Sequence, residues 1–229
     1  MPTPIDYKAP FMPENFYLLT CRSIDGIRLF KRIGDFDHFQ NKFRHFLGQF
    51  MEVWGYSMVT NHANFVVRTQ NIEKVLHYLE HINLEKRTVT MHQFMHHTSQ
   101  PGFFDRMLER QMNSFLVSYA NYYNYNYARQ GGLFQKPFRR KRILDQQSLM
   151  QQVVQINADP QKRRLVPDFR AYPFSGYNDM VKNEVPWTAA DKVLELFGSF
   201  DEYEQRHVAE ASVPYNIDPP VKPQRIITM

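Results

Sequence analysis

The stretch Trp54-Gly-Tyr-Ser-Met-Val-Thr-Asn-His-Ala-Asn-Phe-Val-Val-Arg68 decides the fold of this chain and also raises the question of its function. Apolar and aromatic residues at about 53–59 and 63–69 predict two consecutive strands. Side chains two positions apart on a strand point to the same face, so His62 and Asn64 should stand together while their neighbours face the other way. This is the spacing of a pair of metal ligands, but only one of the two is a histidine.

The segment from Met58 to Phe65 has the pattern Met-x-x-Asn-His-x-x-Phe, which resembles the Met-Pro-Asn-His-Phe-His motif of the single-tyrosine HUH transposases, specifically their REP-associated branch. The resemblance implies a site in which two histidines hold a divalent metal, and Asn64 stands at the second histidine position. One interpretation is a vestigial, oxygen-rich site in which His62, Asn64 and Asp159 bind Mg²⁺ or Mn²⁺ weakly. The other is that these are ordinary polar residues at a strand edge and that the protein has no cofactor.

The stretch from Leu149 to Tyr177 resembles the nucleophile helix of the same family and the segment that follows it. Aligned on its proline, the family pattern Tyr-Ile-His-x-Asn-Pro-x-x-x-x-Leu-Val puts the tyrosine at Gln155, the histidine at Asn157 and the asparagine at Asp159. A glutamine amide cannot attack a phosphodiester and keep a covalent phosphate link, so the resemblance implies that the nucleophile is missing. The alternative is a displaced nucleophile on another helix, namely Tyr119, Tyr122, Tyr123, Tyr125 or Tyr127.

An aromatic ladder followed by a basic run fills the stretch from Ser118 to Arg142. Clustered cations attract phosphates and tyrosine rings offer stacking faces for unpaired bases, so the stretch predicts a nucleic-acid surface. The alternative is a helix that buries its tyrosines, followed by a solvated basic turn. The family patterns Ser-Tyr-Ala-x-x-Phe-Asn and Arg-x-Gly-x-Leu-Phe-Gln-x-x-Phe-x-Arg match this stretch almost throughout, which favours the surface. The predicted nucleic-acid-binding residues are Tyr122, Arg129, Lys136, Arg139, Arg140, Lys141, Arg142, Lys162 and Arg163.

Patterns on either side of the central strands predict an α+β fold. Residues 15–22 alternate as a first strand, 36–50 carry an apolar helical stripe, and 71–84 predict a second helix. The order strand, helix, strand, strand, helix is typical of a ferredoxin-like antiparallel sheet with helices packed on one face. The polar residues 85–111 should form a loop-rich connection, and a helix should run from about 104 towards 127.

The 229 residues allow one compact domain plus an extension. We predict a transposase-like domain at 1–180, followed at 181–229 by a C-terminal helical extension and a proline-rich extended tail. Apolar residues make up 43% of the chain, which excludes wholesale disorder, and no apolar run is long enough to cross a bilayer. The absence of an export signal and the single cysteine, Cys21, predict a cytoplasmic location.

A further histidine pattern, His92-x-x-x-His96-His97, has the spacing of metal ligands on one helical face. Its flanks are polar and no cysteine or acidic residue lies close to it in the sequence. A solvated histidine cluster is the simpler interpretation, and we assign it no role.

The resemblance covers about residues 16–207 and implies a homodimer that recognises hairpins in single-stranded DNA. The formal net charge of +5 is modest but unevenly distributed, as an anion-binding face requires. The leading hypothesis is a transposase-like protein that binds single-stranded or hairpin DNA without cleaving it. The first alternative is an active transposase or nickase that uses a shifted tyrosine or a metal-bound water. The second is a protein-interaction module whose basic surface is incidental.

Overall fold

The computed structural model describes residues 8–100, 102–181, 187–213 and 215. At its centre lies an antiparallel sheet of four strands in the order β2-β3-β1-β4. The strands span Phe16–Arg22 (β1), Met51–Val59 (β2), His62–Thr69 (β3) and Arg139–Ile143 (β4). The prediction of an α+β fold with a ferredoxin-like antiparallel sheet is therefore confirmed. No helix in the described part of the chain is long and apolar enough to span a membrane.

Helix α1, Ile33–Leu47, carries the chain from β1 to β2, and β3 fills the gap between these two strands. Its predicted apolar stripe is real, because Phe39, Phe43 and Leu47 are buried. The helix begins where the Asp35 carboxylate accepts the backbone N–H of Arg32 at 2.9 Å. The apolar period and the acidic residue near the start together fix this helix.

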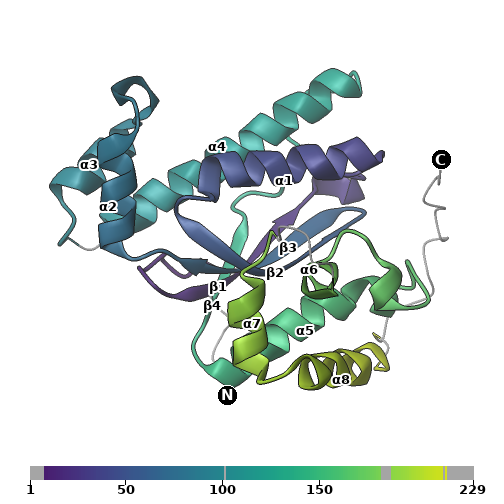
Figure 1. Cartoon of the computed structure of the whole chain (residues 1–229). Helices are drawn as coiled ribbons and strands as arrows, with labels where there is room; N and C mark the ends of the chain where they lie inside the picture. The colour runs from purple at the N-terminus through teal and green to yellow at the C-terminus, as the bar shows by residue number, and fades with distance from the viewer. Residues whose placement is uncertain (1–7, 101, 182–186, 214, 216–229) are drawn as a thin grey trace, which may run out of the picture.

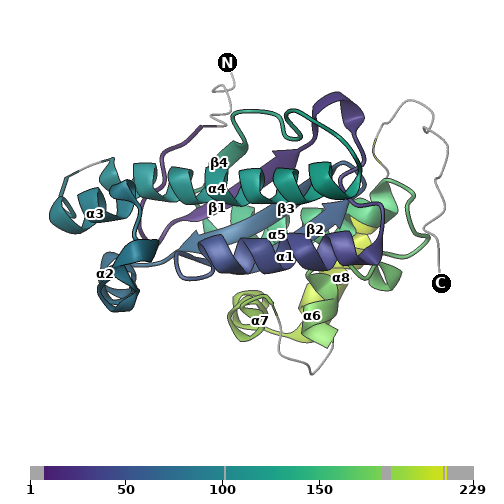
Figure 2. The ribbon, with the colours of Figure 1, turned by 90° about the horizontal axis from the view of Figure 1, so that it is seen from above.

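Helix α4, Phe103–Asn126, packs alongside α1 on the same face of the sheet (Figure 2). Its buried tyrosines fasten it to the segment before α1, since the hydroxyl of Tyr119 donates to the carbonyl of Leu29 and that of Tyr123 to the carbonyl of Arg28, each at 2.8 Å. For these two rings the core interpretation of the aromatic ladder holds.

The predicted loop-rich connection at 85–111 was wrong in part, because it contains a helix. Helix α2, Ile72–His81, ends before a short 3₁₀ turn at Leu84–Lys86, and α3 follows at Val89–His96. Helix α3 has only eight residues and buries just Met91 and Phe94, so its apolar period is too short to stand out from a polar sequence.

The opposite face of the sheet is covered by a second helical layer, which the prediction of helices on one face did not include (Figure 1). Its central element is α5, Gln146–Lys162, which packs against β2 and β3 and against α8, Phe200–Ala211. Gly55 permits this approach, because a Cβ there would lie 3.3 Å from Ile156 Cδ1. Smaller elements complete the layer: a 3₁₀ helix at Phe169–Ala171, α6 at Tyr177–Val181 and α7 at Ala190–Phe197. A further 3₁₀ helix, Ile24–Gly26, follows β1.

The predicted boundary at residue 180 stays a prediction, although α8 packs on α5 from the other side of that boundary. The predicted extended tail lies almost entirely outside the described residues, apart from Tyr215.

The outer edge of β2 is paired with loop backbone. The N–H of Met58 donates to the carbonyl of Phe174 at 3.0 Å, and the N–H of Gly176 donates to the carbonyl of Tyr56 at 2.8 Å. Further along, Ala189 N–H donates to the carbonyl of β2 residue Val53 at 2.7 Å. Loop residues 174–176 thus satisfy strand groups that a sheet edge would otherwise expose.

Candidate nucleic-acid interface

The three residues predicted as a vestigial metal site lie on the α5 side of the sheet, at one end of β3. His62 Nε2 is 3.6 Å from Asp159 Oδ2, so α5 brings this carboxylate close to the strand. Asn64 stands two positions along the same strand, and its Oδ1 accepts a hydrogen bond from Thr20 Oγ1 at 2.8 Å. The amide oxygen that could replace the second imidazole is therefore already engaged by a hydroxyl of β1.

The Asp159 carboxylate is buried and has partners on both oxygens. Arg163 Nε donates to Oδ2 at 2.7 Å, and the Tyr215 hydroxyl donates to Oδ1 at 2.9 Å. Burial raises the pKa of this carboxyl, but hydrogen bonding from His62 and the Arg163 charge outweigh burial and hold the pKa below its usual value. Asp159 is therefore an ionised carboxylate whose counter-ion is the guanidinium of Arg163. A divalent cation would have to compete with the Arg163 guanidinium and the Tyr215 hydroxyl for this carboxylate.

The nucleophile position on α5 holds no ionisable group. Gln155 is half-buried, and its Oε1 accepts a hydrogen bond from Gln152 Nε2 at 2.9 Å. Gln155 and Asp159 lie four residues apart on α5, so their side chains share one face of this helix.

Most of the tyrosines considered as displaced nucleophiles donate hydrogen bonds within the fold. The hydroxyls of Tyr122 and Tyr127 donate to Asp35 at 3.1 and 2.6 Å, and Tyr122 also stacks on His38 with ring centroids 3.7 Å apart. Burial, followed by the Asp35 hydrogen bond, raises the pKa of Tyr127 to about 12, and burial likewise raises that of Tyr119. These phenols are harder to ionise than a free tyrosine, which disfavours attack on phosphate. Tyr125 is the exception, with 90% of its surface exposed.

A buried polar cluster joins α5 to α8 next to this site. Asn157, at the histidine position of the family pattern, has its Nδ2 3.0 Å from the Tyr203 hydroxyl and 3.2 Å from His207 Nε2. His207 Nδ1–H donates to the carbonyl of Tyr203 at 2.7 Å, so Nε2 is the unprotonated nitrogen that accepts from Asn157. Sequence patterns gave no signal of this cluster, because its members are about 50 residues apart.

The protein should lose stability in acid through His207. Burial lowers the pKa of His207 to about 4 from an ordinary value of 6.5. Below pH 6.5 the histidine binds a proton in the unfolded chain but stays neutral in the folded protein. His207 therefore has almost no effect on the free energy of unfolding at pH 7 and lowers it by about 2 kcal/mol at pH 5. Urea unfolding at both pH values should show that His207→Gln removes this part of the acid sensitivity. An equal pH dependence in the two proteins would contradict the neutral, buried histidine.

The predicted cations differ in how accessible they are. Lys136, Arg139 and Arg142 are exposed and Lys141 is half-buried. Four of the predicted cations have contacts within the fold that can be named: Arg129 donates to the carbonyl of Gly132 at 2.6 Å, Arg163 pairs with Asp159, Lys162 pairs with Glu210, and Arg140 pairs with Asp105.

Additional cations gather where α1 begins and α4 ends, a place that Figure 2 shows at the opposite end of the sheet from α2 and α3. Lys31 Nζ lies 4.1 Å from the centre of the Tyr127 ring, and Arg32 Nε donates to the Tyr127 hydroxyl at 3.1 Å. The loop that carries Lys136 reaches the same end, because Gln135 N–H donates to the carbonyl of Arg22 at 2.8 Å. We call Arg22, Arg28, Lys31, Arg32, Arg129 and Lys136 the basic end. Sequence reasoning missed its first four members, since they are separated by about 100 residues from the basic run.

Arg140 departs most from its predicted role on the surface. Its side chain is 8% exposed, lies 3.0 Å from Asp105 Oδ1, and stacks 4.6 Å above the ring of Phe11. Within β4 it points to the α4 face, whereas its neighbours Arg139 and Lys141 point to the other. Arg140 therefore joins β4 to α4, and we leave it out of the proposed surface.

Removing the partner of Arg140 should destabilise the fold. Asp105→Asn leaves a buried guanidinium without its counter-ion, at a cost of about 2 to 3 kcal/mol in the free energy of unfolding. Glu202→Gln is the matched control, because it breaks the exposed pair of Glu202 with Arg206 and should cost less than about 1 kcal/mol. Chemical denaturation of both variants checks the difference, and equal small losses would show that the Arg140 pair is not structural.

Comparison with known proteins bears on the fold alone. No family model and no curated protein matches the sequence. A solved structure described as the REP-associated tyrosine transposase bound to a REP hairpin is similar over 80% of this chain and 88% of that chain, with a TM-score of 0.50 and 11% sequence identity. The chain thus has an α+β fold similar to that of a REP-associated tyrosine transposase.

Proposed function

We propose that this protein binds single-stranded or hairpin DNA without cleaving it. The observation that carries the proposal is the state of α5: Gln155 occupies the nucleophile position, and Arg163 and Tyr215 fill both oxygens of the Asp159 carboxylate. The solved transposase of similar fold is bound to a hairpin, which supports DNA as the ligand class. Fold similarity does not by itself transfer an activity, so the argument depends on the site and the surface.

The surface that we propose for DNA combines the basic end with β4. Arg139, Lys141 and Arg142 extend along β4, which begins beside the C-terminal end of β1 because Arg139 pairs with Thr20. Their charges would release counterions from the phosphate backbone. The exposed ring of Tyr125, near the end of α4, offers a stacking face for an unpaired base.

Binding assays on the full chain test this proposal. Fluorescence anisotropy with a labelled hairpin, a linear single strand, a duplex and an RNA hairpin should give tightest binding to the hairpin or single-stranded DNA and a steep loss with salt. Binding that is absent at all salt concentrations would favour a protein-interaction module on this fold. We also infer a cytoplasmic homodimer, and sedimentation of the free protein and of its DNA complex measures the oligomeric state.

A second candidate function is metal-dependent DNA cleavage by a displaced phenol, and one contact favours it. The Tyr215 hydroxyl lies 2.9 Å from Asp159 Oδ1 and so touches one of the predicted metal ligands, whereas the hydroxyls of Tyr122 and Tyr127 bond to Asp35. Against this candidate, burial and the Asp159 carboxylate raise the pKa of Tyr215, which opposes formation of the phenolate. Tyr215→Phe separates the two candidates, because it should leave DNA binding unchanged and abolish any adduct.

The protein should also respond little to Mg²⁺ or Mn²⁺. Because Asn64 bonds to Thr20 and Asp159 is neutralised by Arg163, either ion should raise the melting temperature by less than about 2 °C, which corresponds to weak binding. Differential scanning fluorimetry with and without the ion measures this shift. A large shift that disappears in His62→Ala would show that the three residues form a working metal site.

A further inference from the structure

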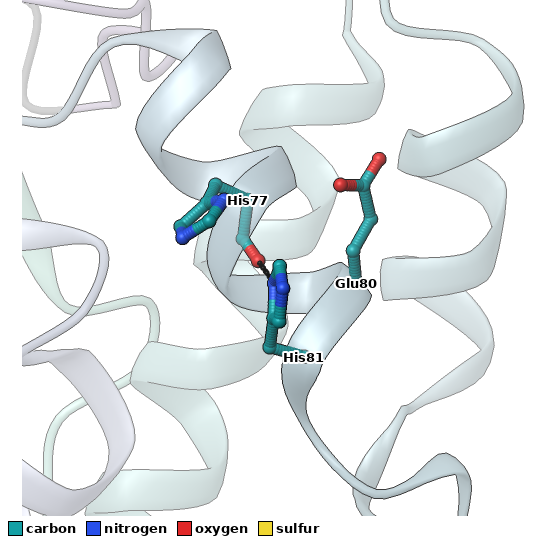
Figure 3. A group of neighbouring side chains, drawn as sticks. All are labelled: His77, Glu80 and His81. Atoms are coloured by element: carbon teal, nitrogen blue, oxygen red, sulfur yellow. Dashed lines mark hydrogen bonds between the residues drawn. The ribbon is translucent and has the colours of Figure 1, made fainter.

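Helix α2 carries a cluster of potential metal ligands that is separate from the proposed DNA surface. His77, Glu80 and His81 each offer one ligand atom, and these atoms lie within 4.8 Å of one another (Figure 3). Positions three and four residues apart on a helix share a face, which explains why these side chains meet. The other face of α2 holds the buried residues Val75 and Leu79, so the cluster points to solvent.

A backbone hydrogen bond prepares one of the imidazoles for a metal. His81 Nδ1 lies 2.7 Å from the carbonyl oxygen of His77, and a carbonyl can only accept, so Nδ1 carries the proton. The lone pair of His81 is therefore on Nε2 and is free of that bond. Metal-binding histidines characteristically donate their second ring nitrogen to a carbonyl or a carboxylate, which fixes the tautomer and the ring. The rings of His77 and His81 are adjacent, with centroids 4.3 Å apart.

We propose that His77, Glu80 and His81 form a surface site for Zn²⁺ or a chemically similar divalent transition-metal ion. Two imidazole nitrogens and one carboxylate oxygen form a donor set that suits Zn²⁺, with water in the fourth position of a tetrahedron. Mg²⁺ and Ca²⁺ prefer oxygen ligands throughout, so they should not compete. All three side chains are exposed and can adjust their rotamers to reach bond lengths of about 2.0 to 2.2 Å.

The chain contains a matched control on α3. His92 and His96 have the same four-residue spacing as His77 and His81. Among the described residues, however, no His, Cys, Asp or Glu side chain completes, with this pair, a set of three ligand atoms within 4.8 Å of one another. A difference between the two pairs would show that the Glu80 cluster, and not histidine content, binds the ion.

Calorimetric titration of the tag-free full chain with Zn²⁺ tests the proposal. The wild type should bind one equivalent at α2, and His77→Ala with His81→Ala should lose it. Glu80→Gln should bind at least about 10-fold more weakly, in line with the losses seen when the environment of a metal ligand is changed. The absorption spectrum of bound Co²⁺ should report a tetrahedral site in the wild type and not in the double variant.

Two controls keep the result interpretable. One equivalent of Zn²⁺ should still bind to the double variant His92→Ala with His96→Ala, and also to the single variant His62→Ala. These results would separate this site from α3 and from the proposed DNA-binding region. Melting curves without metal should be the same for the wild type and the α2 variants, because every substituted α2 side chain is exposed. The proposal is overturned if the wild type takes up no Zn²⁺, or if the His77 and His81 double variant keeps its full affinity.

Discussion

A variant with Lys136→Gln, Lys141→Gln and Arg142→Gln should bind single-stranded or hairpin DNA about 100-fold more weakly than the wild type at about 0.1 M salt. Each phosphate contact contributes about 0.7 to the slope of log K against log salt for a single strand, so three contacts amount to about 2 log units between about 0.1 M and 1 M salt. The slope should flatten by the same amount. Arg140 is left in place because its loss would damage the fold as well as the surface.

A charge-matched variant distinguishes a local surface from a general effect of net charge. Lys74→Gln, Lys86→Gln and Arg110→Gln remove three charges from exposed positions. Two of these lie on or beside α2, at the other end of the sheet from the basic end (Figure 2). This variant should keep most of its affinity and its salt slope. If both variants lose affinity equally, DNA is held by diffuse attraction and the proposed surface is wrong.

The second large effect concerns cleavage. The wild type should form no covalent adduct with labelled single-stranded or hairpin DNA in the presence of Mg²⁺ or Mn²⁺, because Gln155 has no nucleophilic oxygen. Asn64→His combined with Gln155→Tyr should restore a detectable adduct at position 155, whereas each single change should remain inactive, since a nucleophile and its metal act as a unit. The contacts of Asn64 with Thr20 and of Tyr215 with Asp159 are the visible obstacles to this restoration.

Adding Tyr215→Phe to the restored variant makes the experiment sharper. It removes the hydroxyl that occupies Asp159 Oδ1 and so opens the carboxylate to a metal, and it also removes the second candidate nucleophile. The adduct should then increase and should map to position 155 by mass spectrometry. An adduct in the unmodified protein, on Tyr215 or on any other tyrosine, would replace the non-cleaving proposal with the enzymatic one.

The central part of the fold could be predicted because its signals are local. Alternation along β3 placed His62 and Asn64 on one face, and the stripe of Phe39 and Phe43 placed α1, since both patterns depend only on side-chain spacing within one element. The approach of Asp159 to His62 was also anticipated, but only through resemblance to a family, because no spacing rule joins residues almost 100 positions apart.

The roles of individual charges could not be predicted, because they depend on which face of an element meets which neighbour. Arg140 looked like part of a basic run, yet its burial is decided by Asp105 on α4 and by the direction of one side chain in β4. The contact of Tyr215 with Asp159 was equally invisible, since it joins a tail with no periodic pattern to the middle of α5. The composition shows only that cations are present, whereas the packing of the elements determines which of them pair with other groups of the fold.

The pairing of β2 with loop residues 174–176 limits how two copies of this chain can meet. An unpaired strand invites a second molecule to continue the sheet, and repetition of that step leads to polymers. Here the loop backbone already pairs with part of the outer edge of β2, and the cations of β4 repel an identical strand at the opposite edge. Sheet continuation is therefore disfavoured at both edges, so we expect the proposed homodimer to form through surfaces other than the sheet edges.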